Sequence, residues 1–177
     1  MGIVFQYGSN TCAARLNSPS RLSSDAKPID KAQTVDDYEI FFNVLSLKNQ
    51  CAASNICLRE GSKVWGVLYD IPDELIRGKP KGRKSLEQIE GQKYNEQPIL
   101  VVKPNGDRVP AVTFAADKAN CQEGLSTSVW YLSWILYGLR EHKVDEDYIE
   151  HVRQRAIDTN GQAKVNTQNQ IELIKTL

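Results

Sequence analysis

The chain has 177 residues, of which 41% are hydrophobic and 25% are charged, and its 22 Lys and Arg residues balance its 22 Asp and Glu residues. This composition is typical of a globular protein, for which we expect a single domain over residues 1–177, and the neutral charge disfavours nucleic acid or an anionic membrane as a partner. No apolar run approaches the ~20 residues of a membrane span, and Met1–Asn10 lacks the basic start and apolar core of a signal peptide, so we expect a cytoplasmic protein.

Strand-forming residues begin the chain. Residues 3–5 predict a strand that ends in the turn-forming sequence Tyr7-Gly8-Ser9-Asn10. Asn10 or Thr11 is then expected to cap a short helix over residues 13–16. Residues 18–36 are polar and predict a long surface loop.

More strands are expected in the middle of the chain, over residues 38–45, 54–58 and 63–70. In the last of these, Trp65, Val67 and Tyr69 alternate with other residues and are expected to share one face. Pro72 favours a helical turn over residues 73–76, and a basic, mobile loop is expected over residues 77–84.

Ser85 is a predicted N-cap for a short helix over residues 86–90, which Gly91 ends. Two further strands are expected over residues 98–103 and 108–115, joined as a hairpin by the turn at residues 104–107.

The last third is predicted to be helical. Leu132, Ile135, Leu136 and Leu139 recur at helical spacing behind a cap at residues 126–128. A second helix is expected over residues 145–157, closed by Gly161, and residues 158–177 predict a peripheral tail or docking helix. Since the strands precede the long helices, we expect an α+β fold with a small sheet or closed barrel.

The cysteines and histidines do not form a recognisable metal-binding pattern. No C-x-x-C pair occurs, and the two histidines are nine positions apart, so neither a metal site nor a cofactor is expected. In a cytoplasmic protein the cysteines are expected to be reduced thiols. The four cysteines and two histidines of the chain are Cys12, Cys51, Cys57, Cys121, His142 and His151.

The turn Tyr7-Gly8-Ser9-Asn10 is the first candidate for chemistry. A glycine after a strand lets the backbone turn sharply, so that successive amide N–H groups point into one concavity and bind a carboxylate or a developing oxyanion. Taken alone, the same residues also suit an ordinary surface turn.

Glu90 is the second candidate. It lies in the last turn of its predicted helix, where a carboxylate faces the unfavourable end of the helix dipole. If the side chain is also buried, both effects raise its pKa toward the range useful for acid–base catalysis near neutrality. The alternative is a solvated surface glutamate.

Together these motifs resemble the gamma-glutamylcyclotransferase family. The resemblance extends over residues 3–155 and rests on Y-G-S-N at 7–10, V-W-G-V-L-Y at 64–69, L-E-Q-I-E-G at 86–91 and S-V-W-Y at 128–131. It implies a small mixed β-barrel flanked by short helices, with a C-terminal helix pair. It also implies a reaction in which the α-amino group of a γ-glutamyl substrate attacks its own γ-carbonyl, giving 5-oxoproline and a free amine.

The resemblance also implies roles for individual residues. Glu90 would be the general acid and base, and the residues Tyr7, Gly8, Ser9 and Asn10 would hold the γ-glutamyl group. Tyr94 and Tyr131 would line the pocket, although Tyr131 is equally suited to the core. The partner would be a small γ-glutamyl molecule, and we expect a monomer or a homodimer.

Three departures from the family leave the substrate open. Glu87 stands where the family usually has aspartate, Asn95 follows Tyr94 where many relatives have a basic residue nearby, and the loop over residues 77–84 is unusually basic. The glutathione-degrading branch usually shows Y-G-S-L, which disfavours glutathione.

Two other functions fit the same fold. One is a non-catalytic binding module, and the other is a tailoring enzyme that removes a γ-glutamyl protecting group from a natural product. Arg15 is expected either to hold a substrate carboxylate or to form a surface ion pair. Trp65, Trp130 and Trp134 are expected in packing rather than as a stacking platform.

Overall fold

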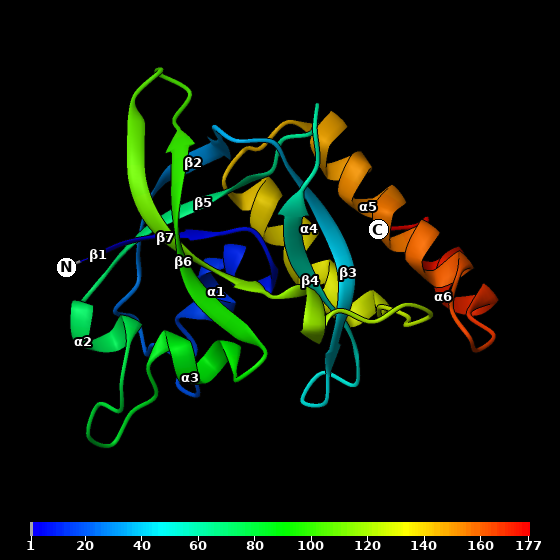
Figure 1. Ribbon diagram of the computed structural model, residues 1–177, viewed down its shortest axis with the longest axis horizontal. Helices are drawn as coiled ribbons and strands as arrows, with labels where there is room; N and C mark the ends of the chain where they lie inside the picture. Colours follow the sequence, from blue (N-terminus) through cyan, green and yellow to red (C-terminus); the bar gives the residue numbers. More distant parts are fainter. Residues whose placement is uncertain (1) are drawn as a thin grey trace.

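Five strands close into a barrel in the computed structural model, which describes residues 2–177 (Figure 1). The first strand pairs with the last in parallel, whereas every other pair in the barrel is antiparallel, so the barrel is mixed. The predicted α+β fold with a small mixed barrel is therefore confirmed. In barrel order the strands are β1 (Gly2–Gln6), β5 (Trp65–Ile71), β2 (Lys27–Thr34), β6 (Tyr94–Val102) and β7 (Arg108–Ala116).

Two further strands form a separate antiparallel sheet beside the barrel. These are β3 (Tyr38–Ser46) and β4 (Cys51–Leu58), joined by a short turn. A single bridge between Val44 and Cys121 links β3 to the segment that follows β7. The observed strands β4 and β6 begin three and four residues earlier than the sequence predicts.

Strand β2 corrects the prediction of a surface loop over residues 18–36. Its ladder with β5 and β6 is non-local, for example Lys27 opposite Asp70 and Gln33 opposite Val102. Only Ala32 and Thr34 are buried along the strand, so the sequence shows little apolar alternation. The proline at position 28 is tolerated because the register shifts there.

The short helices lie at one end of the barrel. The helix α3 (Leu86–Glu90) begins as predicted, because the Ser85 hydroxyl accepts from Gln88 N–H while the Gln88 side chain accepts from Ser85 N–H. The helices α1 (Ala13–Leu16) and α2 (Asp73–Ile76) are also confirmed. However, neither Asn10 nor Thr11 caps α1, because both belong to a 3-10 turn and Cys12 occupies the N-cap position.

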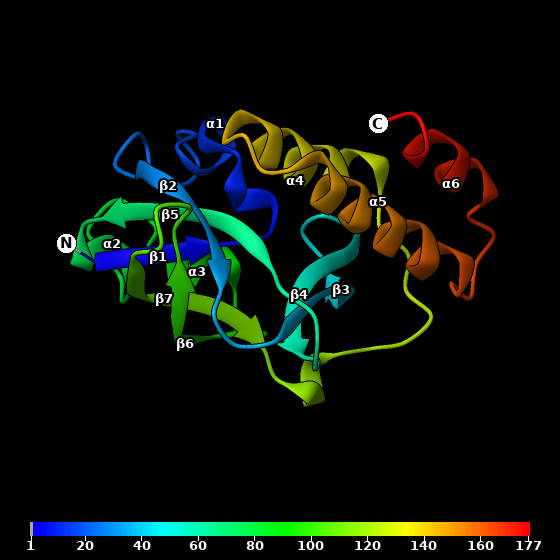
Figure 2. The same ribbon diagram turned by 90° about the horizontal axis from the view of Figure 1, so that it is seen from above.

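The C-terminal part is helical, as expected. The helix α4 (Val129–Glu141) is capped by the Ser128 hydroxyl, and α5 (Glu146–Gly161) lies alongside it (Figure 2). The helix α6 (Gln168–Ile174) packs against both of them through the buried Ile174. Among residues 2–177, no helix has both the length and the apolar character that crossing a membrane requires.

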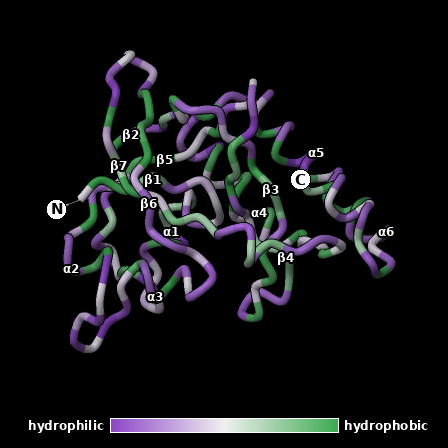
Figure 3. The backbone as a smooth tube through the Cα atoms, in the orientation of Figure 1, coloured by the Kyte–Doolittle hydropathy of each residue, from purple (hydrophilic) through white to green (hydrophobic). Residues whose placement is uncertain are grey.

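The strand β5 divides two clusters of buried side chains. Val67 and Tyr69 belong to the cluster that contacts α1, α2 and α3, whereas Leu68 belongs to the larger cluster shared with β3, β4, α4 and α5. Trp65 packs against the larger cluster, so it does not join Val67 and Tyr69 as predicted. Figure 3 shows the loop between α2 and α3 as a hydrophilic segment, and neither cluster includes residues 77–84.

Candidate active site

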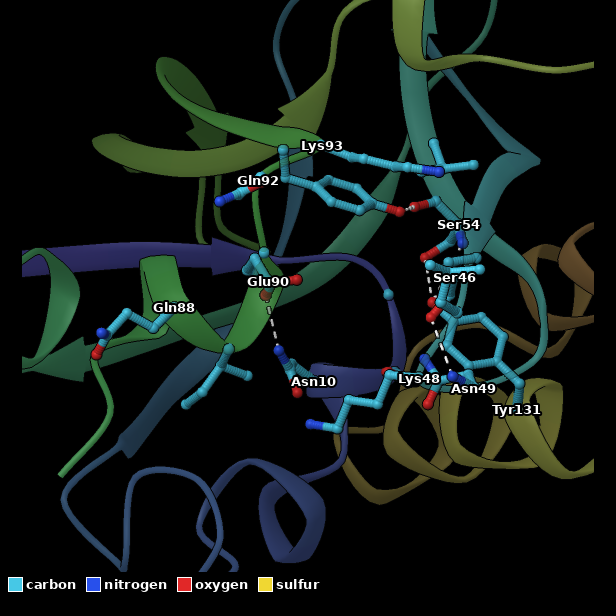
Figure 4. A pocket seen from close by; sticks show the side chains of 18 of the residues that line it. Asn10, Ser46, Lys48, Asn49, Ser54, Gln88, Glu90, Gln92, Lys93 and Tyr131 are labelled. Atoms are coloured by element: carbon cyan, nitrogen blue, oxygen red, sulfur yellow. Dashed lines mark hydrogen bonds between the residues drawn. The ribbon is translucent and has the colours of Figure 1, made fainter.

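One cavity of about 410 Å³ opens where the end of β1, the helix α3 and the β3–β4 sheet meet. Its walls come from segments that are far apart in the sequence (Figure 4). Every site residue expected from the sequence lines this cavity: Tyr7, Gly8, Ser9, Asn10, Glu90, Tyr94 and Tyr131.

Glu90 is the only acidic residue that lines the cavity within residues 2–177. It lies at the end of α3, and its Oε1 accepts a hydrogen bond of 2.7 Å from Asn10 Nδ2 (Figure 4). Burial raises the pKa of the Glu90 carboxyl, although nearby Arg21 and the bond from Asn10 partly oppose the shift. The result is a carboxyl group that binds a proton more readily than an exposed glutamate does.

Arg21 is a site residue that the sequence analysis missed. Its Nη1 donates a 2.7 Å hydrogen bond to Asn10 Oδ1, and the residue is only 9% exposed. Because the guanidinium can only donate, Asn10 must direct its oxygen toward Arg21 and its NH₂ group toward Glu90. Arg21 therefore fixes the orientation of the amide that holds the carboxylate. It comes from the polar segment that was expected to be a surface loop, where no local signal distinguishes it.

The loop after β1 is held from several sides. The Tyr7 hydroxyl donates to Phe114 O at 2.7 Å, and Thr11 N–H closes the 3-10 turn (Ser9–Thr11) by donating to Gly8 O at 2.9 Å. Gly8 has an ordinary φ of −97°, so the backbone conformation does not require glycine there. The requirement is space, because a Cβ at Gly8 would lie 2.5 Å from Ser54 Oγ.

The helix α4 approaches the other side of this loop. A Cβ at Gly138 would lie 2.3 Å from Cys12 N and 2.4 Å from Thr11 Oγ1, so only glycine permits this contact. The Gly138 position thus sets how closely the helix packs behind the loop.

Tyr94 and Tyr131 are both fixed by Ser54 of the strand β4. The Tyr94 hydroxyl donates to Ser54 O at 2.6 Å, while the Tyr131 hydroxyl lies 3.0 Å from Ser54 Oγ and accepts from Ser54 N–H at 3.1 Å. Burial raises the pKa of both phenols, so they stay protonated at neutral pH. They are suited to shaping the cavity wall and joining the β3–β4 sheet to it, rather than to transferring protons.

Arg15 and the tryptophans lie outside the cavity. The Arg15 guanidinium lies 5.0 Å from the ring centroid of Trp130 and 5.6 Å from that of Trp134, and no carboxylate of residues 2–177 pairs with it. Of the two alternatives for Arg15, the surface ion pair is therefore not formed within the described residues, and the guanidinium makes cation–π contacts instead. Trp130 is 53% exposed and packs edge-to-face against Trp134, with the ring centroids 6.2 Å apart, so its packing is at the surface.

Cys12 follows the loop directly, but its side chain is fully buried and does not line the cavity. Burial raises the pKa of its thiol, which disfavours the reactive thiolate. Nowhere in residues 2–177 do three His, Cys, Asp or Glu side chains gather in an arrangement that could hold a metal ion.

Comparisons with known proteins agree with this geometry. Residues 63–152, about half of the chain, match the model of the AIG2-like family, and this stretch contains Glu90, Tyr94 and Tyr131. No curated protein sequence matches the chain.

Solved structures share the whole fold. One titled gamma-glutamyl cyclotransferase has a TM-score of 0.75 and 21% identity, over 99% of each chain. An uncharacterized protein from Homo sapiens has a TM-score of 0.74 and 21% identity, over 98% of each chain. YkqA from Bacillus subtilis has a TM-score of 0.67 and 19% identity, over 92% of this chain and 55% of its own. At these identities the likeness establishes the fold.

Proposed function

This chain belongs to the AIG2-like family, and on that premise we propose that it is a gamma-glutamylcyclotransferase, which converts a γ-glutamyl amine or amino acid into 5-oxoproline and a free amine. The observation that supports this most directly is the environment of Glu90. Within residues 2–177, a single carboxyl group lines the cavity; its pKa is raised, and Asn10 holds one of its oxygens.

The first step is cyclisation. Glu90 takes a proton from the α-ammonium group of the substrate, which frees the nitrogen lone pair to attack the γ-carbonyl carbon. A bent substrate brings these two atoms together, and holding a flexible chain in that shape supplies several kcal/mol of the barrier reduction. The new C–N bond closes a five-membered ring, and the carbonyl oxygen becomes an oxyanion.

The second step is release of the amine. The protonated Glu90 donates its proton to the nitrogen of the leaving group, the original amide C–N bond breaks, and the carbonyl re-forms in the ring. The ring nitrogen still carries two hydrogens after the attack, and Glu90 takes one of them and passes it to the released amine, so that the products are a neutral lactam and an ammonium group. Glu90 ends as a carboxylate, so the cycle is complete and consumes no other reactant. A carboxyl with a raised pKa is suited to both transfers, because it lies nearer to neutrality than an ordinary glutamate.

The loop Tyr7-Gly8-Ser9-Asn10 has the role of binding the γ-glutamyl group. In its 3-10 turn, Thr11 N–H makes the first internal hydrogen bond, to Gly8 O. The N–H groups of Ser9 and Asn10 come earlier in the chain, so the turn's own hydrogen bonds do not use them. These groups suit an oxyanion or a carboxylate in the adjacent cavity. Tyr94 and Tyr131 line the same cavity, and the Tyr131 hydroxyl would lie 3.7 Å from a Cβ at Gly8.

The proposal includes a single-domain, cytoplasmic enzyme that acts as a monomer or a homodimer and needs no cofactor for the two steps above. The rival function on this fold is a binding module without turnover. A module would bind γ-glutamyl compounds and release nothing.

Measuring 5-oxoproline release from γ-glutamyl-alanine, γ-glutamyl-ε-lysine and glutathione, with wild type and Glu90→Gln, separates the two. We expect release by the wild type from at least one γ-glutamyl substrate and its loss in the variant. Binding without release from any substrate would favour the module.

A further inference from the structure

The cavity is markedly basic, although the chain as a whole is neutral. Among the described residues, four basic side chains line it and only Glu90 is acidic. The basic residues are Arg21, Lys48, Lys84 and Lys93.

Two of these cations are already engaged by the protein. Arg21 donates to Asn10, and Lys93 Nζ donates to Leu45 O at 2.8 Å. Within residues 2–177, Lys48 and Lys84 form neither a hydrogen bond nor an ion pair with a protein group. They are therefore available to a ligand.

Lys48 and Lys84 line the same cavity from two different segments of the chain. Lys48 lies in the turn between β3 and β4, and Lys84 ends the basic loop before α3. Partial burial lowers the pKa of the Lys48 ammonium, and repulsion from Arg21 and Lys84 lowers it further. Figure 4 shows the Lys48 side chain extended past Asn10 along the cavity. An anion bound between the two lysines would relieve this repulsion.

We propose that the amine released by this enzyme is an acidic amino acid, whose side-chain carboxylate binds between Lys48 and Lys84. The inference rests on the proposed function and specifies its substrate class. A γ-glutamyl dipeptide with a neutral side chain carries two carboxylates and one ammonium group, whereas the described cavity lining has four basic residues against the single acidic Glu90, so positive charge remains in excess for a further carboxylate. A lysine-type or polycationic amine would meet repulsion from the same residues.

The test compares two substrates that differ in charge and hardly in shape, γ-glutamyl-glutamate and γ-glutamyl-glutamine. We expect kcat/KM of the wild type to favour the glutamate compound by about tenfold or more, mainly through KM, because the ion pair with two lysines that line the cavity is lost with the amide. Raising the ionic strength should reduce the preference, since salt screens an interaction at the cavity mouth.

Variants connect the preference to the two lysines. Lys48→Gln and Lys84→Gln should each reduce the ratio of the two kcat/KM values several-fold, and the double variant should abolish it. Lys81→Gln is the matched control, because Lys81 is exposed in the same basic loop and does not line the cavity. It should leave the ratio unchanged.

The outcomes separate the inference from the proposed function. Equal kcat/KM for the two substrates, a preference for the glutamine compound, or a preference that survives in the double variant overturns the inference while 5-oxoproline release upholds the function. Release of 5-oxoproline from γ-glutamyl-alanine alone likewise overturns the inference and upholds the proposed function. Release from none of these three substrates overturns the inference, and the absence of release from γ-glutamyl-ε-lysine and glutathione as well overturns the proposed function.

Discussion

Replacing Glu90 with glutamine removes the charge of the only carboxyl group that the described residues contribute to the cavity and keeps its shape. The glutamine Oε1 still accepts the hydrogen bond from Asn10 Nδ2, which is 2.7 Å long in the wild type, so Asn10 and Arg21 can keep their positions. The variant therefore tests proton transfer with little change to the walls of the site.

The expected loss of activity is large, because no neighbouring side chain can replace Glu90 in proton transfer. Within residues 2–177, no other carboxyl group, no histidine and no cysteine lines the cavity, and the tyrosines there have raised pKa values. A positioned acid or base contributes about 10²- to 10⁴-fold. Since Glu90 is proposed to act in both steps, we expect kcat to fall about 1,000-fold or more.

The fold should survive this change, and its stability should respond to pH with a defined sign. The pKa of Glu90 is raised in the folded state, so the folded protein binds this proton more tightly than the unfolded chain. The contribution of this proton to the free energy of unfolding is therefore lost as pH rises from the pKa of Glu90 in the unfolded chain through its pKa in the folded protein. The free energy of unfolding of the glutamine variant should not show this decrease, because glutamine does not titrate. Thermal unfolding of both proteins across that range measures the difference.

The assay is 5-oxoproline formation under saturating substrate, with Glu87→Gln as the control. Glu87 lies on the same helix, is exposed, does not line the cavity and accepts from Gly78 N–H, so its variant should stay within about twofold of wild type, as surface changes usually do. A folded Glu90→Gln protein with more than a tenth of wild-type kcat would refute the assignment of the general acid and base.

The remaining predictions concern the groups around Glu90. In the wild type, the acidic limb of the pH profile of kcat/KM should lie at higher pH than the pKa range of an exposed glutamate. Arg21→Gln should move this limb to still higher pH, because Arg21 lowers the pKa of Glu90. A limb that does not move would argue against this coupling. Gly138→Ala places a Cβ 2.3 Å from Cys12 N, so unfolding should become easier by about 1–3 kcal/mol and KM should rise; unchanged melting and KM would contradict the close packing. Cys12→Ser should retain most activity, and an inactive, folded variant would reveal a role for the thiol.

Elements with local signals could be predicted from the sequence. The helix α3 has a capping serine before it and Gly91 after it, and α4 has an apolar stripe from Leu132 to Leu139. Strand β2 could not be predicted in this way, because its residues are mostly polar and only its pairing with β5 and β6 makes it a strand.

In the candidate site, too, features with a local signal could be predicted from the sequence, and features that arise from the tertiary fold could not. The position of Glu90 at a helix end indicated a raised pKa, and the resemblance to a family indicated the loop that faces it. The sequence did not indicate that Asn10, 80 positions earlier, bonds to Glu90 or that Arg21 orients that amide. It also did not indicate that Lys48 and Lys84 face one cavity, because such proximity arises only from the tertiary fold.

The β3–β4 sheet has a consequence for how the proposed activity can diversify. Strand β4 is anchored at Ser54 by two tyrosine hydroxyls, whereas the turn between β3 and β4 reaches the cavity with Lys48. Glu90, the proposed acid and base, resides on a different segment, α3. Selection or engineering could therefore replace the turn and change which amine the proposed reaction releases, while the anchored strand and the helix that carries Glu90 stay in place.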